Sequence, residues 1–159
     1  MQATTHETPQ VTRLSSAFQD MRVRLSTLWV FAVLNYVYCD VVTLMNPAYV
    51  NGLVAGNAGG IQVTPVFLLA AGILVEIPIA MVLLSRALKY RANRWANIVA
   101  GATMTVVQAA SLFLSTPGLY YIFFSAAEIG ATLLIVWFAW KWHAVSDSNV
   151  MRIQASSNA

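Results

Sequence analysis

The chain has 159 residues, of which 58% are hydrophobic and only 9% are charged. Soluble domains carry about a quarter charged residues, so this composition argues against a soluble fold. The formal charge is +3, from nine Lys and Arg against six Asp and Glu, and the basic residues fall near the ends of hydrophobic segments, where such residues orient membrane spans. We therefore expect an integral membrane protein that contacts the lipid bilayer and binds no nucleic acid.

The two ends of the chain are polar. Residues 1–14 are rich in Thr, Gln and Ser, and too few are apolar to offset the entropy of folding, so we expect a disordered cytoplasmic tail. Residues 144–159 form a second polar tail, and the transmembrane domain is expected between them, over residues 15–143. Apolar residues begin to recur at helical spacing at Leu14, Phe18, Met21 and Leu25. This spacing predicts either a short helix on the membrane surface or an extension of the first span.

Four apolar segments are each long enough to cross the hydrocarbon core, which takes about 20 residues at 1.5 Å per residue. They cover residues 25–45, 63–85, 95–114 and 119–140. The predicted fold class is an all-α membrane protein with a bundle of four transmembrane helices. Cys39 is the only cysteine, so no disulfide forms within the chain.

The basic residues lie on one side of this topology. They precede the first span, fill the link between the second and third spans, and follow the fourth, whereas the other two loops have none. Because cytoplasmic loops carry the excess of Lys and Arg, both termini are expected in the cytoplasm. All five Trp residues fall at the same predicted ends, as an interfacial aromatic belt requires.

The link between the first two spans, residues 46–62, contains four glycines and no charged residue. A loop of this length is either functional or merely slack. The sequence therefore leaves two interpretations open, a lid over a site and a flexible linker.

One carboxylate, Glu76, lies in the middle of the second span, where no other residue from Val63 to Ser85 is ionisable. A carboxyl at this depth costs several kcal/mol unless it is neutral, paired or facing a wet cavity, so it marks a candidate site. Pro78 follows two residues later and lacks an N–H group, which predicts a kink beside the acid.

The other three spans carry polar residues at a similar depth. Counted from the outer end of each span, Asp40 lies at roughly 8 Å, Gln108 at roughly 9 Å, Glu128 at roughly 12 Å and Glu76 at roughly 16 Å. We predict that the three acids are catalytic and face one another around a common cavity. The predicted ligand-binding residues around them are Asn35, Tyr36, Gln108, Tyr121 and Ser125.

Three carboxyls close together in a low dielectric do not all ionise, so at least one is expected to hold a proton. A protonated acid beside an ionised one serves acid–base chemistry, and it serves proton-coupled transport as well. Our first hypothesis is isomerisation, cyclisation or binding of an apolar, lipid-like ligand. The alternatives are a small proton-coupled transporter and a non-catalytic accessory subunit of a membrane complex. A further alternative is that the carboxyls serve only to join neighbouring helices by hydrogen bonds. A homo-oligomer is compatible with each of these functions. The spans lack metal-ligand spacing, and neither a metal nor a cofactor is expected.

Five motifs carry a resemblance to a known group of proteins. They are Leu25-Ser-Thr-Leu-Trp29, Asn35-Tyr-Val-Tyr-Cys-Asp40, Glu76-Ile-Pro78, Tyr90-Arg-Ala-Asn-Arg-Trp95 and Glu128. With them the chain resembles a family of small bacterial four-helix membrane proteins of unknown function over about residues 25–142. Its general layout is also similar to that of the DoxX-like group. The resemblance implies the topology given above and a bacterial inner membrane, and it implies no activity.

Overall fold

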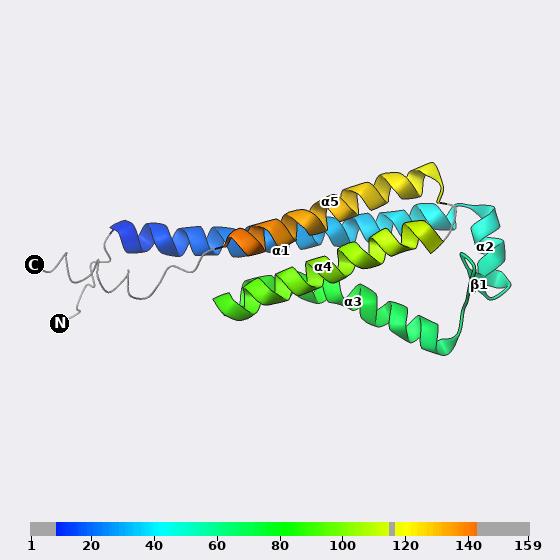
Figure 1. Cartoon of the computed structure of the whole chain (residues 1–159), viewed down its shortest axis with the longest axis horizontal. Coiled ribbons are helices and arrows are strands. Elements are labelled where there is room, and N and C mark those ends of the chain that lie inside the picture. The colour runs from blue at the N-terminus through cyan, green and yellow to red at the C-terminus, as the bar shows by residue number, and fades with distance from the viewer. Residues whose placement is uncertain (1–8, 115–116, 143–159) are drawn as a thin grey trace, which may run out of the picture.

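The computed structural model describes residues 9–114 and 117–142. The elements are α1 (Pro9–Leu44), α2 (Pro47–Val54), β1 (Asn57–Ala58), β2 (Ile61–Gln62), α3 (Pro65–Ala87), α4 (Tyr90–Leu114) and α5 (Leu119–Lys141). Four of these helices are long and apolar enough to cross a membrane, which confirms the predicted fold class (Figure 1). Residues 1–8 and the expected tail at residues 144–159 lie outside the described residues.

The first span is longer than predicted. Helix α1 runs without a break from Pro9, so residues 9–14 belong to a helix and not to the expected tail. Of the two interpretations of the apolar repeat before the span, the helical extension is the one that the structure adopts. Once a helix is nucleated, each added residue gains a backbone hydrogen bond, so an apolar span propagates easily into a flanking segment that contains no Gly.

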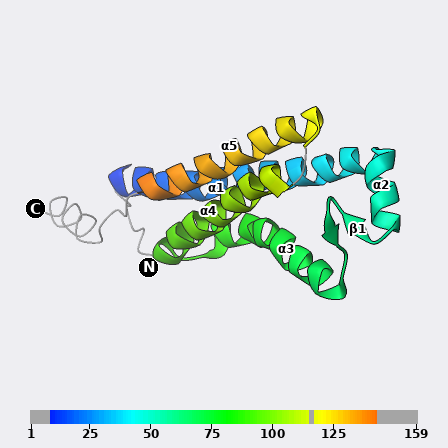
Figure 2. The same cartoon turned by 45° about the vertical axis from the view of Figure 1, so that its right-hand side comes forward.

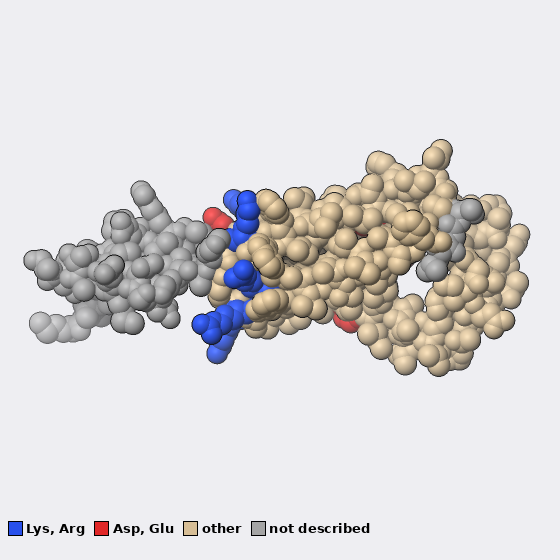
Figure 3. Space-filling model, viewed as in Figure 1, with Lys and Arg blue, Asp and Glu red and all other residues tan. Residues whose placement is uncertain are grey.

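Helix α5 packs against both α1 and α4, while α3 packs mainly against α1. The buried residues of α3 are Pro78, Met81 and Ser85, all in its second half. Its first half diverges from the other three long helices (Figures 1 and 2). The space-filling view shows a gap through the molecule in this region (Figure 3). One side of the bundle is therefore open where α3 begins.

The interior of the bundle contains polar residues as well as an apolar core, whereas its exterior is apolar. The buried polar residues are Ser26, Ser85, Asn93, Asn97, Gln108, Ser125, Glu128 and Thr132. Large apolar side chains such as Leu69, Phe113 and Phe123 are exposed. Lipid solvates such an apolar exterior, and helices in a membrane associate through small and hydrogen-bonding residues between them.

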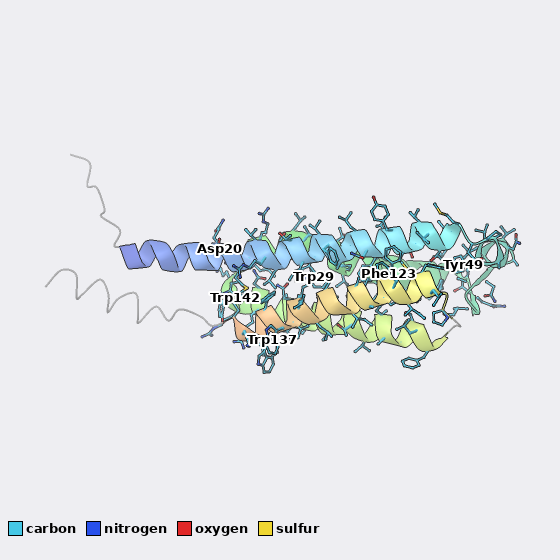
Figure 4. The ribbon with its side chains drawn as sticks, turned by 90° about the horizontal axis from the view of Figure 1, so that it is seen from above. Asp20, Trp29, Tyr49, Phe123, Trp137 and Trp142 are labelled. Atoms are coloured by element: carbon cyan, nitrogen blue, oxygen red, sulfur yellow. The ribbon has the colours of Figure 1, made fainter. Side chains whose placement is uncertain are left out.

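The two ends of the bundle differ in charge. Figure 3 shows Lys and Arg gathered in a band at one end, which we name the basic end. The Lys and Arg residues with described side chains are Arg22, Arg24, Arg86, Lys89, Arg91, Arg94 and Lys141. Trp137 and Trp142 lie toward this end, and Tyr49 lies at the other (Figure 4). We name that other end, formed by α2 and the β1–β2 hairpin, the hairpin end.

The link over residues 46–62 has a defined structure. Asn46 caps α2 by accepting the Ala48 N–H at 3.0 Å, and β1 pairs with β2 in an antiparallel hairpin. Between the two strands, Gly59 and Gly60 have φ values of 60° and 96°. Positive φ at both central residues is what a type I′ hairpin turn requires, and Gly adopts it without strain. The segment is therefore not a slack linker.

Candidate functional site

A groove of about 570 Å³ opens at the hairpin end, between α1, α2, the β1–β2 hairpin, α4 and the start of α5. Its polar lining residues are Asp40, Thr43, Asn46, Tyr49, Ser111, Tyr120 and Tyr121. Among the described residues that line it, Asp40 is the one with a charged side chain. The volume lies within the range of small-molecule sites in proteins. The described residues contain no group of three or more His, Cys, Asp or Glu that would hold a metal ion.

Tyr49 brings α2 into this site. Its hydroxyl interacts electrostatically with Asp40, Tyr120 and Tyr121. Burial, followed by the negative charge of Asp40, raises the pKa of the Tyr49 hydroxyl above its ordinary value. The phenol therefore stays neutral at physiological pH and remains able to donate a hydrogen bond to a ligand.

Glu128 is the most buried acid among the described residues, with 1% of its surface exposed. Neither carboxyl oxygen has a hydrogen-bond partner among those residues, and the buried hydroxyl of Tyr36 has none either. Tyr36, Cys39 and Asp40 of α1 all interact electrostatically with Glu128. Buried polar groups without partners are rare in proteins, and each calls for an explanation. This interior position is where a proton, a water or a ligand group is expected.

A series of hydrogen bonds connects the groove with the level of Glu128. The Tyr121 hydroxyl donates to Ser111 Oγ at 2.8 Å, and Ser111 Oγ donates to the Gln108 carbonyl at 2.7 Å. The Gln108 side chain then donates from Nε2 to Ser125 Oγ at 2.8 Å. Ser125 lies three residues before Glu128 and therefore on the same face of α5. The predicted residues Gln108, Tyr121 and Ser125 are thus brought together as expected.

Two of the predicted site residues lie elsewhere. Glu76 is exposed on α3 and does not line the groove. Asn35 donates from Nδ2 to the Phe31 carbonyl of its own helix at 2.8 Å. Of the three acids predicted to share one cavity, Asp40 alone lines the groove: Glu128 is buried and interacts electrostatically with Asp40 without lining the groove, and Glu76 faces away from it. The physical reason is that α3 packs through the face that carries Pro78 and Met81, and that face excludes the acid.

A second polar cluster, at the level of Trp29, was not predicted. Trp29 Nε1 and Ser85 Oγ both donate to Asn97 Oδ1, at 2.8 and 3.1 Å. Asn97 Nδ2 donates to Asn93 Oδ1 at 2.6 Å, and Asn93 Nδ2 donates to the Ser85 carbonyl at 2.5 Å. The four residues are fully buried and join α1, α3 and α4. The sequence offered one signal for this cluster, namely that Asn93 and Asn97 lie four residues apart beside the basic link between the second and third spans. Because all four have partners, we assign the cluster a structural role.

The comparisons with known proteins give one match. No curated protein and no solved structure matches the chain. A protein-family model matches residues 16–148, a region that includes all four candidate spans and every lining residue of the groove. The chain belongs to the family of unknown function DUF6326.

Proposed function

We propose that the protein binds a lipid-like ligand in the groove at the hairpin end, and that Asp40 and Glu128 exchange a proton with it. The observation that carries this proposal is that Asp40, an exposed acid on the groove wall, interacts electrostatically with Glu128, a buried acid without a hydrogen-bond partner among the described residues. Two acids in such different surroundings suit general acid–base chemistry, such as isomerisation or cyclisation. The predicted catalytic set is thereby reduced from three acids to two.

The different surroundings of Asp40 and Glu128 indicate which of them acts as the acid and which as the base. An ionised Glu128 would be buried without a hydrogen-bond donor, and Tyr36, Cys39 and Asp40 on α1 would repel its charge if they were ionised as well. Burying a charge without a partner is costly, so Glu128 holds the proton and acts as the acid. Asp40 has exposed surface on the groove wall and bears a negative charge at a lower cost than the fully buried Glu128, so we assign it the role of the base.

The position of the groove favours a ligand that comes from the membrane. It lies within a bundle whose exterior is apolar, and the first half of α3 leaves one side of that bundle open (Figure 2). Ile61 and Pro117 add apolar surface to the groove wall. A lipid-like molecule can therefore place its chain against the bundle while its polar part enters the groove.

The groove favours binding and chemistry over proton-coupled transport. A transporter would also use a buried acid, but it needs access to that acid from both sides of the membrane. Leu25, Trp29 and Ile135 are fully buried and belong to the apolar core of the bundle. Together with the cluster around Asn97 they occupy the interior, so the site is reached from the hairpin end. For an accessory subunit we find no supporting observation among the described residues.

The proposed location is a bacterial inner membrane with both termini in the cytoplasm. The band of Lys and Arg at the basic end supports this orientation, because cytoplasmic ends of membrane spans carry such residues. The bacterial origin and the DoxX-like layout rest on the resemblance of the sequence motifs.

The test uses four proteins: wild type, Asp40→Asn, Glu128→Gln and Glu76→Gln. Each is extracted in a neutral detergent, and the molecules that remain bound are identified by native mass spectrometry. Glu76→Gln is a matched control, since it removes a carboxyl from a span without touching the groove. We expect the same bound lipid-like molecule in wild type and Glu76→Gln, and its loss or replacement in the other two. An identical set of bound molecules in all four proteins would overturn the proposal.

A further inference from the structure

The groove combines one carboxylate with three aromatic rings. Asp40 comes from α1, Tyr49 from α2, and Tyr120 and Tyr121 from the first turn of α5. Among its described lining residues no Lys, Arg or His occurs. The sequence contains no Lys or Arg between Arg24 and Arg86, so none is available from α2 or the hairpin.

We infer that the polar part of the ligand is an organic cation, either a quaternary ammonium or a protonated amine. The inference rests on the proposed function, because it names the ligand class of the same groove. A cation is attracted to the faces of aromatic rings and to a carboxylate. A phosphate or carboxylate group would instead meet the negative charge of Asp40 with no basic residue to bind it.

The local structure leaves these groups free for a ligand. The hydroxyl of Thr43 donates to the Cys39 carbonyl at 2.8 Å and is thus engaged within α1. No described residue forms a hydrogen bond or an ion pair with the Asp40 carboxylate. The hydroxyl of Tyr121 is held by Ser111, which fixes one edge of its ring in the groove wall. The carboxylate is thus unneutralised beside rings that are already positioned.

At the basic end, a cationic side chain of the protein itself forms a cation–π contact with an aromatic ring. There, Lys141 Nζ lies 4.1 Å from the centroid of the Trp137 ring. The rings at the hairpin end have no such partner within reach, because the described Lys and Arg side chains gather at the opposite end of the bundle (Figure 3). None of the described Lys and Arg side chains therefore supplies a cation to the groove.

The experiment compares choline with its uncharged isostere, 3,3-dimethylbutan-1-ol. Ligand binding to the folded protein raises its melting temperature, so the purified full chain is melted in neutral detergent at increasing concentrations of each compound. Dodecyltrimethylammonium is added as a third probe, because it presents the same headgroup from within the micelle. We expect stabilisation by the cations and at least tenfold weaker binding of the isostere. Binding of choline itself indicates that a free cation suffices, whereas binding of the amphiphile alone indicates a lipid headgroup; both support the inference.

Four variants separate the effect of charge from that of shape. Asp40→Asn should weaken choline binding tenfold or more, and Tyr49→Leu by about 2- to 30-fold. Tyr49→Phe keeps the ring and should therefore bind choline more tightly than Tyr49→Leu does. Glu76→Gln should show no change and controls for folding.

Equal binding of choline and its isostere, or an Asp40→Asn protein that binds choline as wild type does, would overturn the inference. In that case a lipid-like molecule that still co-purifies with wild type and is lost from Glu128→Gln would leave the proposed function standing. If the bound molecule is the same in all variants, the proposed function itself fails.

Discussion

Trp29 and Asn97 are joined by a hydrogen bond of 2.8 Å from the indole Nε1 to the amide Oδ1, between α1 and α4. Both side chains are fully buried, and Asn97 also accepts from Ser85 and donates to Asn93. One amide thus satisfies polar groups on three helices. In a membrane interior, where water does not replace a lost partner, this makes Asn97 the central residue of the cluster.

We predict that Asn97→Leu destabilises the bundle by about 1–3 kcal/mol, because it leaves the Trp29 and Ser85 donors without an acceptor. Unfolding in mixed micelles measures the change. Trp29→Phe in the same assay is the control, and the double variant should lose less than the sum of the two, since the residues share one bond. An Asn97→Leu protein as stable as wild type would show that the cluster contributes nothing.

Gly101 lies at a close contact between α4 and α5. A Cβ added there would lie 2.8 Å from Val136 Cγ2 and 3.3 Å from the Thr132 carbonyl. We predict that Gly101→Ala costs about 1–3 kcal/mol, as overpacking usually does. Gly130→Ala is the matched control, because an added Cβ at Gly130 meets nothing within 4 Å and Ala favours the helix. Equal melting temperatures for the two variants would contradict the packing described for this interface.

Glu76→Gln should leave thermal stability unchanged or raise it. On insertion scales, an acid at the centre of a span raises the free energy of membrane insertion by about 2.5 to 3.5 kcal/mol. Glu76 is exposed on α3, where no described residue forms a bond that would offset this cost. Melting curves of the two proteins in the same detergent measure the difference. A clear loss of stability would mean that the carboxyl of Glu76 has a structural partner outside the described residues.

The proposed orientation, with both termini in the cytoplasm, predicts which end of the bundle is accessible from outside the cell. After Cys39 is replaced by Ala, a single cysteine is introduced by Ala55→Cys at the hairpin end or by Ala92→Cys at the basic end. Both positions are exposed. Once the outer membrane is permeabilised, a membrane-impermeant thiol reagent should label the Ala55→Cys protein. The Ala92→Cys protein should be labelled only after the inner membrane is permeabilised as well. The opposite pattern would place the termini outside.

The four spans could be predicted from the sequence because apolar runs of sufficient length and basic ends are local properties. The hairpin was not predicted, although Gly59-Gly60 is a preferred sequence for a two-residue hairpin turn. The continuous start of α1 was missed because the polar composition of residues 9–14 does not by itself prevent a helix from extending.

Which acid faces the interior could only partly be predicted. Helix α5 carries Tyr121, Ser125, Glu128 and Thr132 on one helical face, and the last three of these are buried in the structure, so this stripe is a local signal for the side that faces the interior. Around Glu76 the residues of α3 are apolar on all sides, so the sequence contains no signal for the direction of its side chain. The groove itself depends on where α2 and the hairpin fold back over Asp40, a long-range arrangement that no local pattern encodes.

The central claim is that Glu128 holds a proton beside an ionised Asp40, and infrared difference spectroscopy at neutral pH tests it without any ligand. The spectrum of wild type minus Glu128→Gln isolates the Glu128 carboxyl, and wild type minus Asp40→Asn isolates that of Asp40. We predict a protonated carboxyl band in the first difference and ionised carboxylate bands in the second. Ionised carboxylate bands in the first difference would contradict the claim.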